Sequence, residues 1–392
     1  MKRFLIGSAI LISLLGMPAQ NALGDANEIA TPSINAGFQA SISAGAYHTC
    51  AVLGNGAVKC WGRNDVGQLG NRSNVSRSYP VQVAGLTAGV IGISAGRTHT
   101  CAVTISGAAK CWGDNQSGQL GNGSNIDSNR PVAVRGLNNG VSSISAGSDH
   151  TCAVLIAGGV KCWGAGGYGR LGDGSNASSN VPLNVVDLGT QVKSIAAGGF
   201  HTCALLVDGV VKCWGRNRFG QIGDGTTTDR YTPTQVTGLS LGATQVTAEG
   251  SYACAVLTNG SVSCWGYNSL GNLGDGTTTN RYTPTQVLGL TSGVSQVIAR
   301  SYTACALLTT GSVKCWGYNN NGQIGDGTAT DRYTPTQVSG LTSGVERISV
   351  GGFFACSLLS TGTVKCWGDN SFGKLGDGST TDRYAPVDVL GL

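Results

Sequence analysis

Residues 191–239 read QVKSIAAGGFHTCALLVDGVVKCWGRNRFGQIGDGTTTDRYTPTQVTGL, and this unit occurs, with substitutions, seven times in the chain. Its two cysteines are ten residues apart, and each cysteine pair follows the previous pair by 51 residues without insertion or deletion. A tryptophan after the second cysteine and a later proline keep the same step. Self-similarity at a fixed period of this length indicates units that stack and bury a continuous core. We therefore expect one repeat domain over residues 36–392.

Each unit contains short apolar segments separated by glycine. We expect strands around 192–197, over 202–206 and 210–214 on either side of the turn Asp208-Gly209, and after Pro233. No stretch has the apolar spacing of a helix. Four short strands in 51 residues are typical of a propeller blade, so the fold prediction is an all-β, seven-bladed β-propeller with about four antiparallel strands per blade. We expect the ring to close by pairing of the C-terminal strand near 386–390 with the N-terminal blade. An open β-solenoid, which needs shorter coils, is the alternative.

The fourteen cysteines predict one disulfide within each blade. Cys50 and Cys60 lie symmetrically about Asn55 in the turn Gly54-Asn55-Gly56, so they face each other across an antiparallel hairpin. An even number of cysteines in an exported chain is typical of a disulfide framework, whereas zinc needs C-x-x-C or Cys/His clusters that the sequence lacks. The predicted disulfides are Cys50–Cys60, Cys101–Cys111, Cys152–Cys162, Cys203–Cys213, Cys254–Cys264, Cys305–Cys315 and Cys356–Cys366.

The N-terminus has the pattern of a secretory signal. Lys2 and Arg3 precede an apolar run over 4–15, and small residues offer cleavage after Ala22 or Gly24. We expect a signal peptide over 1–24, a linker over 25–35 and a secreted protein, periplasmic or extracellular. A second apolar run long enough for a membrane anchor is missing from the sequence. Loss of Lys2 and Arg3 lowers the net charge from +5 to +3, which argues against a nucleic-acid partner.

Two stretches carry a resemblance to a known family: AGAYHTCAVLGNGAVKCWGRNDVGQLG at 44–70 and AGGFHTCALLVDGVVKCWGRNRFGQIGDG at 197–225. They resemble the regulator of chromosome condensation (RCC) repeat, over essentially the whole chain after the signal. The resemblance implies a seven-bladed propeller. Its eukaryotic members include chromatin-binding exchange factors for a small GTPase, and its secreted bacterial members include β-lactamase inhibitor proteins. Paired cysteines, and a uniform step without an inserted hairpin, favour the bacterial, secreted setting.

We call a position that recurs at the 51-residue step a repeat slot. A slot that holds different residues in different repeats is free to specialise. The residue three before the first cysteine and the residue two after the tryptophan vary, and the hairpin register places residue 47 opposite 63, 200 opposite 216, and 302 opposite 318. All hairpins of a propeller point the same way, so both slots should form rings on one face. Aromatic residues and arginine are enriched at binding hot spots; solvated loop residues that tolerate change are the alternative. The predicted partner-binding face consists of Tyr47, Arg63, Arg97, Asp114, Asp149, Tyr168, Phe200, Arg216, Tyr267, Tyr302, Tyr318, Phe353 and Asp369.

Other recurrent residues favour structural roles. The tryptophans should pack between blades, with a ligand-stacking platform as the sharper alternative. The four histidines share one slot, which favours a structural hydrogen bond over catalysis, and every cysteine is in a predicted bridge, so no nucleophile–base grouping can be proposed. A lysine precedes the second cysteine in six of the seven repeats, which suits an exposed strand position that blocks aggregation. Turns that resemble calcium loops only loosely, because they lack D-x-D spacing and a later Glu, carry Asp173, Asp224, Asp275, Asp326 and Asp377.

The sequence thus predicts a monomeric, secreted module that binds an extracellular or periplasmic protein through one face. It should be no enzyme and need no cofactor or metal. One alternative is a guanine-nucleotide exchange factor for a small GTPase. Another is a carbohydrate-binding or enzymatic propeller that uses the central channel, which would place polar or acidic residues around the axis.

Overall fold

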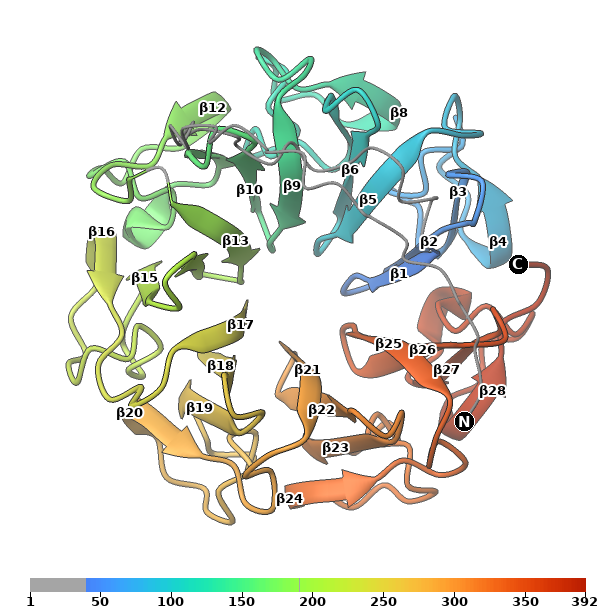
Figure 1. The fold of residues 1–392 in the computed structure, drawn as a ribbon. Helices are drawn as coiled ribbons and strands as arrows, with labels where there is room; N and C mark the ends of the chain where they lie inside the picture. Colours follow the sequence, from blue (N-terminus) through green and yellow to red (C-terminus); the bar gives the residue numbers. More distant parts are fainter. Residues whose placement is uncertain (1–39, 190) are drawn as a thin grey trace, which may run out of the picture. The chain divides into compact units, whose positions relative to one another are not determined.

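The computed structural model describes residues 40–189 and 191–392, and these form seven four-stranded antiparallel sheets arranged as the blades of a propeller (Figure 1). The predicted fold class is therefore confirmed. The signal peptide and linker predicted for 1–24 and 25–35 lie outside the described residues. Within the described residues, no helix is long and apolar enough to cross a membrane.

Each blade uses four strands that follow one another from the axis outward. In chain order the strands are β1 (Ser41–Ala44), β2 (His48–Val52), β3 (Val58–Gly62), β4 (Arg77–Gln82), β5 (Val90–Ala95), β6 (His99–Thr104), β7 (Ala109–Gly113), β8 (Ser128–Ala133), β9 (Val141–Ala146), β10 (His150–Leu155), β11 (Val160–Gly164), β12 (Ser179–Asn184), β13 (Val192–Ala197), β14 (His201–Leu206), β15 (Val211–Gly215), β16 (Arg230–Gln235), β17 (Ala243–Ala248), β18 (Tyr252–Leu257), β19 (Val262–Gly266), β20 (Arg281–Gln286), β21 (Val294–Arg300), β22 (Thr303–Leu308), β23 (Val313–Gly317), β24 (Arg332–Gln337), β25 (Val345–Val350), β26 (Phe354–Leu359), β27 (Val364–Gly368) and β28 (Arg383–Asp388). Single turns of 3-10 helix, η1 (Gly167–Gly169) and η2 (Ser371–Gly373), lie between the third and fourth strands of the third and seventh blades.

The strand predictions for the fourth blade hold to within one residue for β13, β14 and β15. The prediction for the fourth strand was wrong: β16 contains Pro233 and does not follow it. Proline is tolerated there because β16 is the outer edge of its sheet, where a residue can lack a donor on the open side.

The seven disulfides confirm the predicted hairpin register. In each blade the two cysteines stand directly opposite each other on the second and third strands, as Cys50 does to Cys60. Their Cα atoms are 4.0–4.1 Å apart, the close spacing of a pair that exchanges no backbone hydrogen bond. All fourteen cysteines are used in this way. The central hairpin of every blade is therefore fixed in one register.

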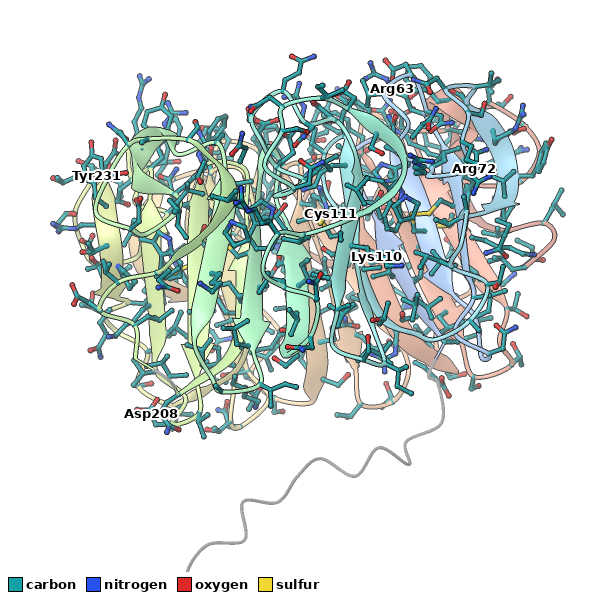
Figure 2. All side chains as sticks on the ribbon, turned by 90° about the horizontal axis from the view of Figure 1, so that it is seen from above. Arg63, Arg72, Lys110, Cys111, Asp208 and Tyr231 are labelled. Carbon is teal, nitrogen blue, oxygen red and sulfur yellow. A yellow bond between two sulfur atoms is a disulfide. The ribbon has the colours of Figure 1, made fainter. Side chains whose placement is uncertain are left out.

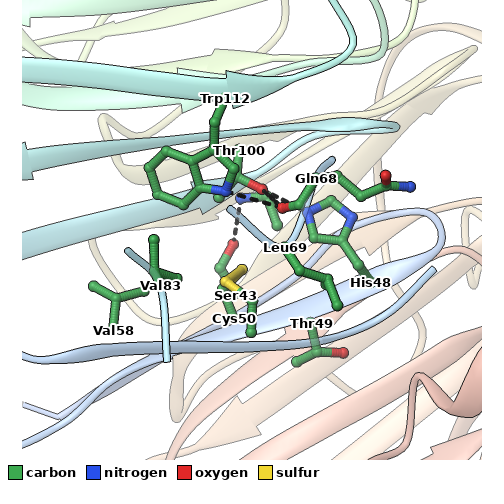
Figure 3. Close-up of a disulfide and its surroundings, with 12 residues drawn as sticks. Ser43, His48, Thr49, Cys50, Val58, Gln68, Leu69, Val83, Thr100 and Trp112 are labelled. Atoms are coloured by element: carbon green, nitrogen blue, oxygen red, sulfur yellow. Dashed lines mark hydrogen bonds between the residues drawn. A yellow bond between two sulfur atoms is a disulfide. The ribbon is translucent and has the colours of Figure 1, made fainter. Parts of the chain in front are cut away.

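Tryptophan joins each blade to the one before it, as predicted. The Trp112 indole is fully buried among Cys50, Val58 and Val83 of the preceding blade. Its Nε1 donates to the carbonyl of Gln68 at 3.0 Å (Figure 3). The equivalent bond recurs at Trp163, Trp214, Trp265, Trp316 and Trp367. All seven tryptophans have no exposed surface, so none forms a stacking platform for a ligand.

The prediction of how the ring closes was wrong. The C-terminal strand β28 pairs with β27 of its own blade and with no strand of the first blade. The first and last blades instead pack side by side: the amide of Ala44 donates to Ser349 Oγ at 2.8 Å, and that of Gly352 to the carbonyl of Gly45 at 3.0 Å. The physical reason is where the sequence repeat begins relative to the strands of a blade. Each repeat begins at the innermost strand, so seven repeats complete seven sheets and leave no strand to share.

Candidate partner-binding face

The loops that follow the first and third strands of every blade gather at one end of the propeller, and we call this surface the loop face. Figure 2 shows Arg63, in the loop after β3, on the upper side, and Asp208, in the turn between β14 and β15, on the lower side. The lower side, which carries the hairpin turns, is the turn face. Because all thirteen residues of the predicted partner-binding face come from the upper loops, they share the loop face.

The two variable slots lie side by side in every blade. Beyond the strands, the hairpin continues with a backbone hydrogen bond from Arg63 N to Tyr47 O at 3.0 Å. The same bond links residues 114 and 98, 165 and 149, 216 and 200, 267 and 251, 318 and 302, and 369 and 353. The register inferred from the cysteines is thus confirmed to the edge of the loop face. That these residues bind a partner stays a prediction.

Ring contacts connect the aromatic residues of neighbouring blades. Tyr267 lies 5.1 Å from Phe219 and 5.6 Å from Tyr302 between ring centroids, so it bridges the fourth, fifth and sixth blades. Tyr318 lies 5.8 Å from Phe353, and Tyr168 lies 6.1 Å from Phe200. Such pairs prefer edge-on geometry at these spacings and hold one another in place. The result is an aromatic arc from the third to the seventh blade.

The aromatic arc does not extend to the second blade, where polar contacts take the place of ring contacts. Thr98 Oγ1 donates to Asp114 at 2.9 Å, and Arg97 lies 3.9 Å from Asp149. Asp369, on the seventh blade, is also used within the protein, because it accepts from Lys374 at 2.7 Å. Five of the predicted residues therefore have polar side-chain partners within the protein: Arg63, Arg97, Asp114, Asp149 and Asp369.

Sequence reasoning missed several residues that contribute to this surface, Arg218 among them. Phe219 and Phe372 occupy the repeat slot of Tyr168, which was recognised, so aligning that slot across the repeats would have found them. Arg170 and Lys374 occupy a slot that is Gln or Asn in the other five repeats, and this change of residue type was the available signal.

Backbone strain is concentrated among the aromatic residues of the loop face. Seven non-glycine residues within the described ranges have φ in the left-handed region, and four are Tyr168 (65°), Tyr302 (68°), Phe353 (63°) and Phe372 (64°). Bulky residues rarely adopt this conformation, which is retained where the surroundings enforce it and is common at functional sites. The loops therefore hold these rings in place at an energetic cost.

A depression of about 250 Å³ lies at the centre of the loop face, rimmed by Tyr47, Phe200 and Tyr302. Glu249 and Arg300 line both this depression and the channel beneath it. They replace the glycine found at the same slot of the other five repeats. The Arg300 side chain reaches from the sixth blade across the axis and donates from Nη1 to the carbonyls of Ala44 (3.1 Å) and Ala95 (3.0 Å).

The channel offers little for catalysis. Arg300 is held by two carbonyls, and Glu249 lies 3.9 Å from its Nε. Glu249 is also the one carboxylate among the described residues that line the channel. Serines such as Ser43 and Ser94 use their hydroxyls to accept amide hydrogens from the next blade. The polar groups at the axis thus hold blades together.

The histidine slot serves the contact between blades. Thr100 Oγ1 donates to the carbonyl of Gln68 at 2.9 Å, so in its 2.7 Å contact with His48 it must accept a hydrogen from Nε2 (Figure 3). His99 and His150 repeat this arrangement with Thr151 and Thr202. Burial, with smaller contributions from Arg300 and His99, lowers the pKa of His48 to about 3. Three of the four histidines are therefore hydrogen-bonded structural groups, as the sequence favoured, whereas neither ring nitrogen of the buried His201 has a partner in the described residues.

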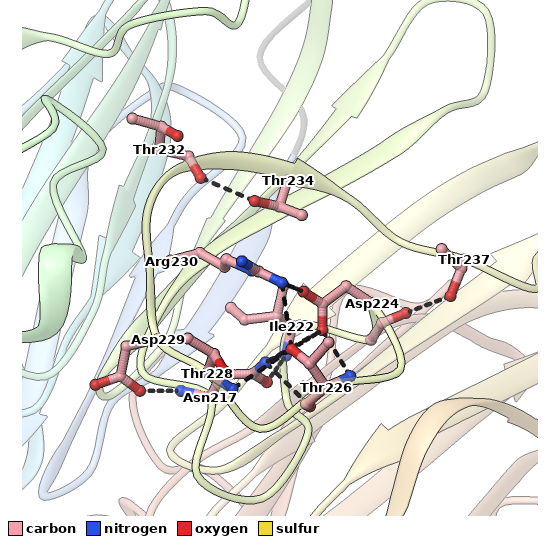
Figure 4. A network of polar contacts seen from close by, with 11 residues as sticks. Asn217, Ile222, Asp224, Thr226, Thr228, Asp229, Arg230, Thr232, Thr234 and Thr237 are labelled. Carbon is pink, nitrogen blue, oxygen red and sulfur yellow. Dashed lines mark hydrogen bonds and ion pairs between the residues drawn. The ribbon is translucent and has the colours of Figure 1, made fainter.

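The aspartates of the proposed calcium loops are occupied by protein groups. Asp224 accepts from the Thr226 amide and hydroxyl and pairs with Arg230 at 2.6 Å (Figure 4). Burial alone would raise the pKa of Asp224, but these bonds hold it below the ordinary carboxyl value. Asp275, Asp326 and Asp377 each pair with the equivalent arginine of their own repeat, which is the first residue of the fourth strand of the blade. Within the described part of the chain, no three His, Cys, Asp or Glu side chains gather as a metal site would require.

Comparison with known proteins gives consistent matches. A family model described as the RCC1-like domain matches residues 12–356, and one described as the Regulator of chromosome condensation (RCC1) repeat matches residues 345–374. The chain is 32% identical to the Ultraviolet-B receptor UVR8 of Arabidopsis thaliana, over 90% of this chain and 81% of UVR8. Among solved structures, human WBSCR16 is similar with a TM-score of 0.77 and 25% identity, covering 86% of this chain and 95% of that one. Prp20p of Saccharomyces cerevisiae shares the fold, with a TM-score of 0.72 and 21% identity over 81% of each chain.

Proposed function

Because the chain belongs to the RCC1-like domain family, we propose that it is a secreted protein-interaction module that holds a macromolecular partner on its loop face and performs no chemistry on it. The observation that carries this proposal is the aromatic arc. Rings from five neighbouring blades form three contacting groups, Tyr168–Phe200, Phe219–Tyr267–Tyr302 and Tyr318–Phe353. All of them are at least partly exposed, and several sit on a strained backbone. Large rings that are already ordered bury much area on binding and lose little entropy.

Three further points support a binding role. The Prp20p structure was described together with its binding properties to Gsp1p and histones, so the fold is able to present a surface to proteins. The polar groups of the channel and of the aspartate turns are paired within the protein, which gives these groups structural roles. The seven disulfides suit an oxidising compartment, and with the signal predicted for residues 1–24 they support export.

The first test removes two rings of the arc. Tyr302→Ala combined with Tyr318→Ala should weaken binding of a partner captured from the native culture by at least about fivefold, because Tyr302 is exposed and Tyr318 is partly exposed on this face. The thermal midpoint of unfolding should stay nearly unchanged. Affinity is measured with the oxidised mature chain immobilised as bait.

The matched control changes exposed apolar residues of the turn face. Ile156→Ser with Val207→Ser, at two hairpin turns, should leave partner affinity unchanged, although these side chains are more exposed than Tyr302. Loss of the partner in this control, with retention in the tyrosine variant, would place binding on the turn face. An equal loss of folding and binding in the tyrosine variant would make the rings structural.

The two alternatives from the sequence remain predictions. An exchange factor would be expected to add an element that engages its GTPase, and every described sheet has only the four strands of its own repeat. A channel-based carbohydrate site would need free polar groups at the axis, where Arg300 and the serines are engaged. Neither alternative gains support from these features, and the bacterial origin likewise stays a prediction.

A further inference from the structure

Two clusters on the loop face are built alike, one where the seventh blade meets the first and one where the third meets the fourth. In the first, the Arg63 guanidinium lies over Tyr47 (5.0 Å) and Phe372 (5.4 Å). In the second, Arg216 lies over Phe200 (5.3 Å) and Tyr168 (5.1 Å), at the same repeat slots. The clusters therefore share their aromatic walls and their central arginine.

A buried cation lies beneath each central arginine, again at one repeat slot. Lys374 Nζ donates to the Gly352 carbonyl at 3.1 Å, and Arg170 Nη1 donates to the equivalent Gly199 carbonyl at 3.0 Å. Both side chains are almost completely buried. Each cluster thus carries two positive charges in equivalent places.

The clusters differ in how these charges are balanced. Arg63 pairs with Asp65 at 2.5 Å, and Lys374 pairs with Asp369 at 2.7 Å, so the first cluster is neutral. The slots of Asp65 and Asp369 hold Arg218 and Ala165 in the second cluster. Both carboxylates are therefore replaced there, and one becomes a third guanidinium.

The second cluster has no ion pair of its own. Among the described residues, no carboxylate lies within 4.0 Å of Arg170, Arg216 or Arg218. Asp149 interacts with Arg170 only at longer range, and its ion-pair partner is Arg97. Arg218 lies over Phe219 at 5.7 Å, as Arg216 lies over its own pair of rings. Arg216 and Arg218 thus face the loop surface without an ion-pair partner, and Arg170 lies buried in the same cluster with only a distant carboxylate.

We propose that this arginine cluster, defined as Arg170, Arg216 and Arg218 with Tyr168, Phe200 and Phe219, binds the carboxylates of an acidic polypeptide segment of the partner. The inference rests on the proposed function and names the chemistry of the partner at that face. A guanidinium stacked on an aromatic ring keeps its N–H edge free and pre-oriented for bidentate bonds to a carboxylate. Arg216 and Arg218 make only these ring contacts, so their donors are available.

The surroundings favour a short acidic segment over an extended polyanion. Phe200 borders the central depression, whose lining includes Asp149 and Glu249, and these carboxylates would repel a chain of phosphates or sulfates that runs on past the cluster. Arg216 and Arg170 both lie over the rings of Tyr168 and Phe200, so guanidiniums already occupy positions that stacked bases would need. A few carboxylates, presented locally by a polypeptide, match the free donors of Arg216 and Arg218, and the buried charge of Arg170 adds to the attraction.

The experiment measures binding of a fluorescent synthetic peptide that carries three glutamates in a Gly/Ser background, at low ionic strength, to the oxidised mature chain. The matched peptide has glutamine at those three positions. We expect saturable binding of one acidic peptide and at least about tenfold weaker binding of the glutamine peptide, because hydrogen bonds to charged groups are the stronger ones. Single-stranded oligothymidylate and heparin are run as competitors.

The protein variants exchange the charges of the two clusters. Ala165→Asp with Arg218→Asp gives the second cluster the carboxylates of the first and should weaken peptide binding at least about tenfold. Asp65→Arg with Asp369→Ala does the reverse and should create a second site, so that two peptides bind per chain. Arg216→Ala, which introduces no new charge, should also weaken binding. Thermal unfolding of each variant checks that the propeller is intact.

Several results would overturn the inference. Unchanged peptide affinity in folded Ala165→Asp/Arg218→Asp and Arg216→Ala, or equal binding of the two peptides, would remove the carboxylate site. Tighter binding of oligothymidylate or heparin, lost in the same variants, would assign the cluster to a polyanion. Self-association that the same variants abolish would assign it to a second copy of the chain. If the peptide fails while Tyr302→Ala/Tyr318→Ala still loses the captured partner, the inference falls and the proposed function stands.

Discussion

Replacing Trp214 by alanine is expected to lower the free energy of unfolding by about 3–5 kcal/mol, the range for removing a large buried aromatic side chain. The Trp214 indole is completely buried among Cys152, Val154 and Leu171 of the third blade. Its Nε1 also donates to the Arg170 carbonyl at 3.0 Å. The variant therefore opens a cavity and loses a hydrogen bond at one seam of the ring. Urea denaturation monitored by circular dichroism measures the change.

Two comparisons make this expectation specific. Tyr302→Ala, on the loop face, should change the free energy of unfolding by no more than about 0.5 kcal/mol, the usual range for surface positions. Trp214→Phe should be more costly than Trp61→Phe, by about 1 kcal/mol, because Trp61 Nε1 has no hydrogen-bond partner among the described residues. Equal values for the two phenylalanine variants would show that the indole hydrogen bond adds nothing at these seams.

Acidification from pH 6.5 to pH 5 is expected to destabilise the folded chain by up to about 2 kcal/mol for each of its four buried histidines. Burial is the main cause that lowers the pKa of these histidines. It lowers the pKa of His99 to about 4 and of His201 to about 3, and it lowers the pKa of His150 well below its ordinary value. With His48 included, all four groups bind fewer protons in the folded protein than in the unfolded chain. Protonation therefore favours unfolding, and stability falls as the pH drops below the unfolded value of 6.5.

Other groups modify this trend in identifiable ways. Burial raises the pKa of Asp149 and of Asp127, so protonation of these two carboxyl groups favours the folded state and opposes the four histidines. Asp224 and its equivalents, whose pKa lies below the ordinary carboxyl value, lose their contribution only in a more acidic range. The histidine effect is thus separable between about pH 6.5 and pH 4.

A single variant tests the assignment to histidine. His201→Tyr introduces the residue of the next repeat, where the Tyr252 hydroxyl donates to the Thr303 carbonyl at 2.7 Å. Neither ring nitrogen of His201 has a partner in the described residues. The variant should be more stable than the parent at pH 7 and lose less stability between pH 6.5 and pH 5. An unchanged slope in urea titrations over this range would contradict the role of the histidines.

Local spacing was enough to predict the blades and the placement of the loop face. Two cysteines ten residues apart fix a hairpin register, and that register extends without change to Tyr47 and Arg63. Four short strands per repeat then leave few architectures other than a propeller. Each step needs only contacts between residues close in sequence.

Features that depend on contacts between blades were not predictable in this way. One repeat does not reveal that Arg300 crosses the axis to Ala44 and Ala95, because that contact joins residues more than 200 positions apart. It also does not reveal that Lys374 and Arg63, from the last and first repeats, meet around Tyr47. The charge of a cluster is a property of two neighbouring blades together, so it emerges only from the assembled ring.

The absence of a shared strand between the first and last blades has a consequence for how such a chain can be rearranged. At the seam between the last and first blades the amide of Ala44 donates to the Ser349 hydroxyl, as the amide of Ala95 donates to Ser43 at the next seam. Linking Leu392 directly to Ala36 would preserve the 51-residue interval from Cys356 to Cys50. A circular permutant joined there and opened between any other two blades would keep every blade complete. Which blade comes first in the gene therefore need not matter for its place in the assembled ring.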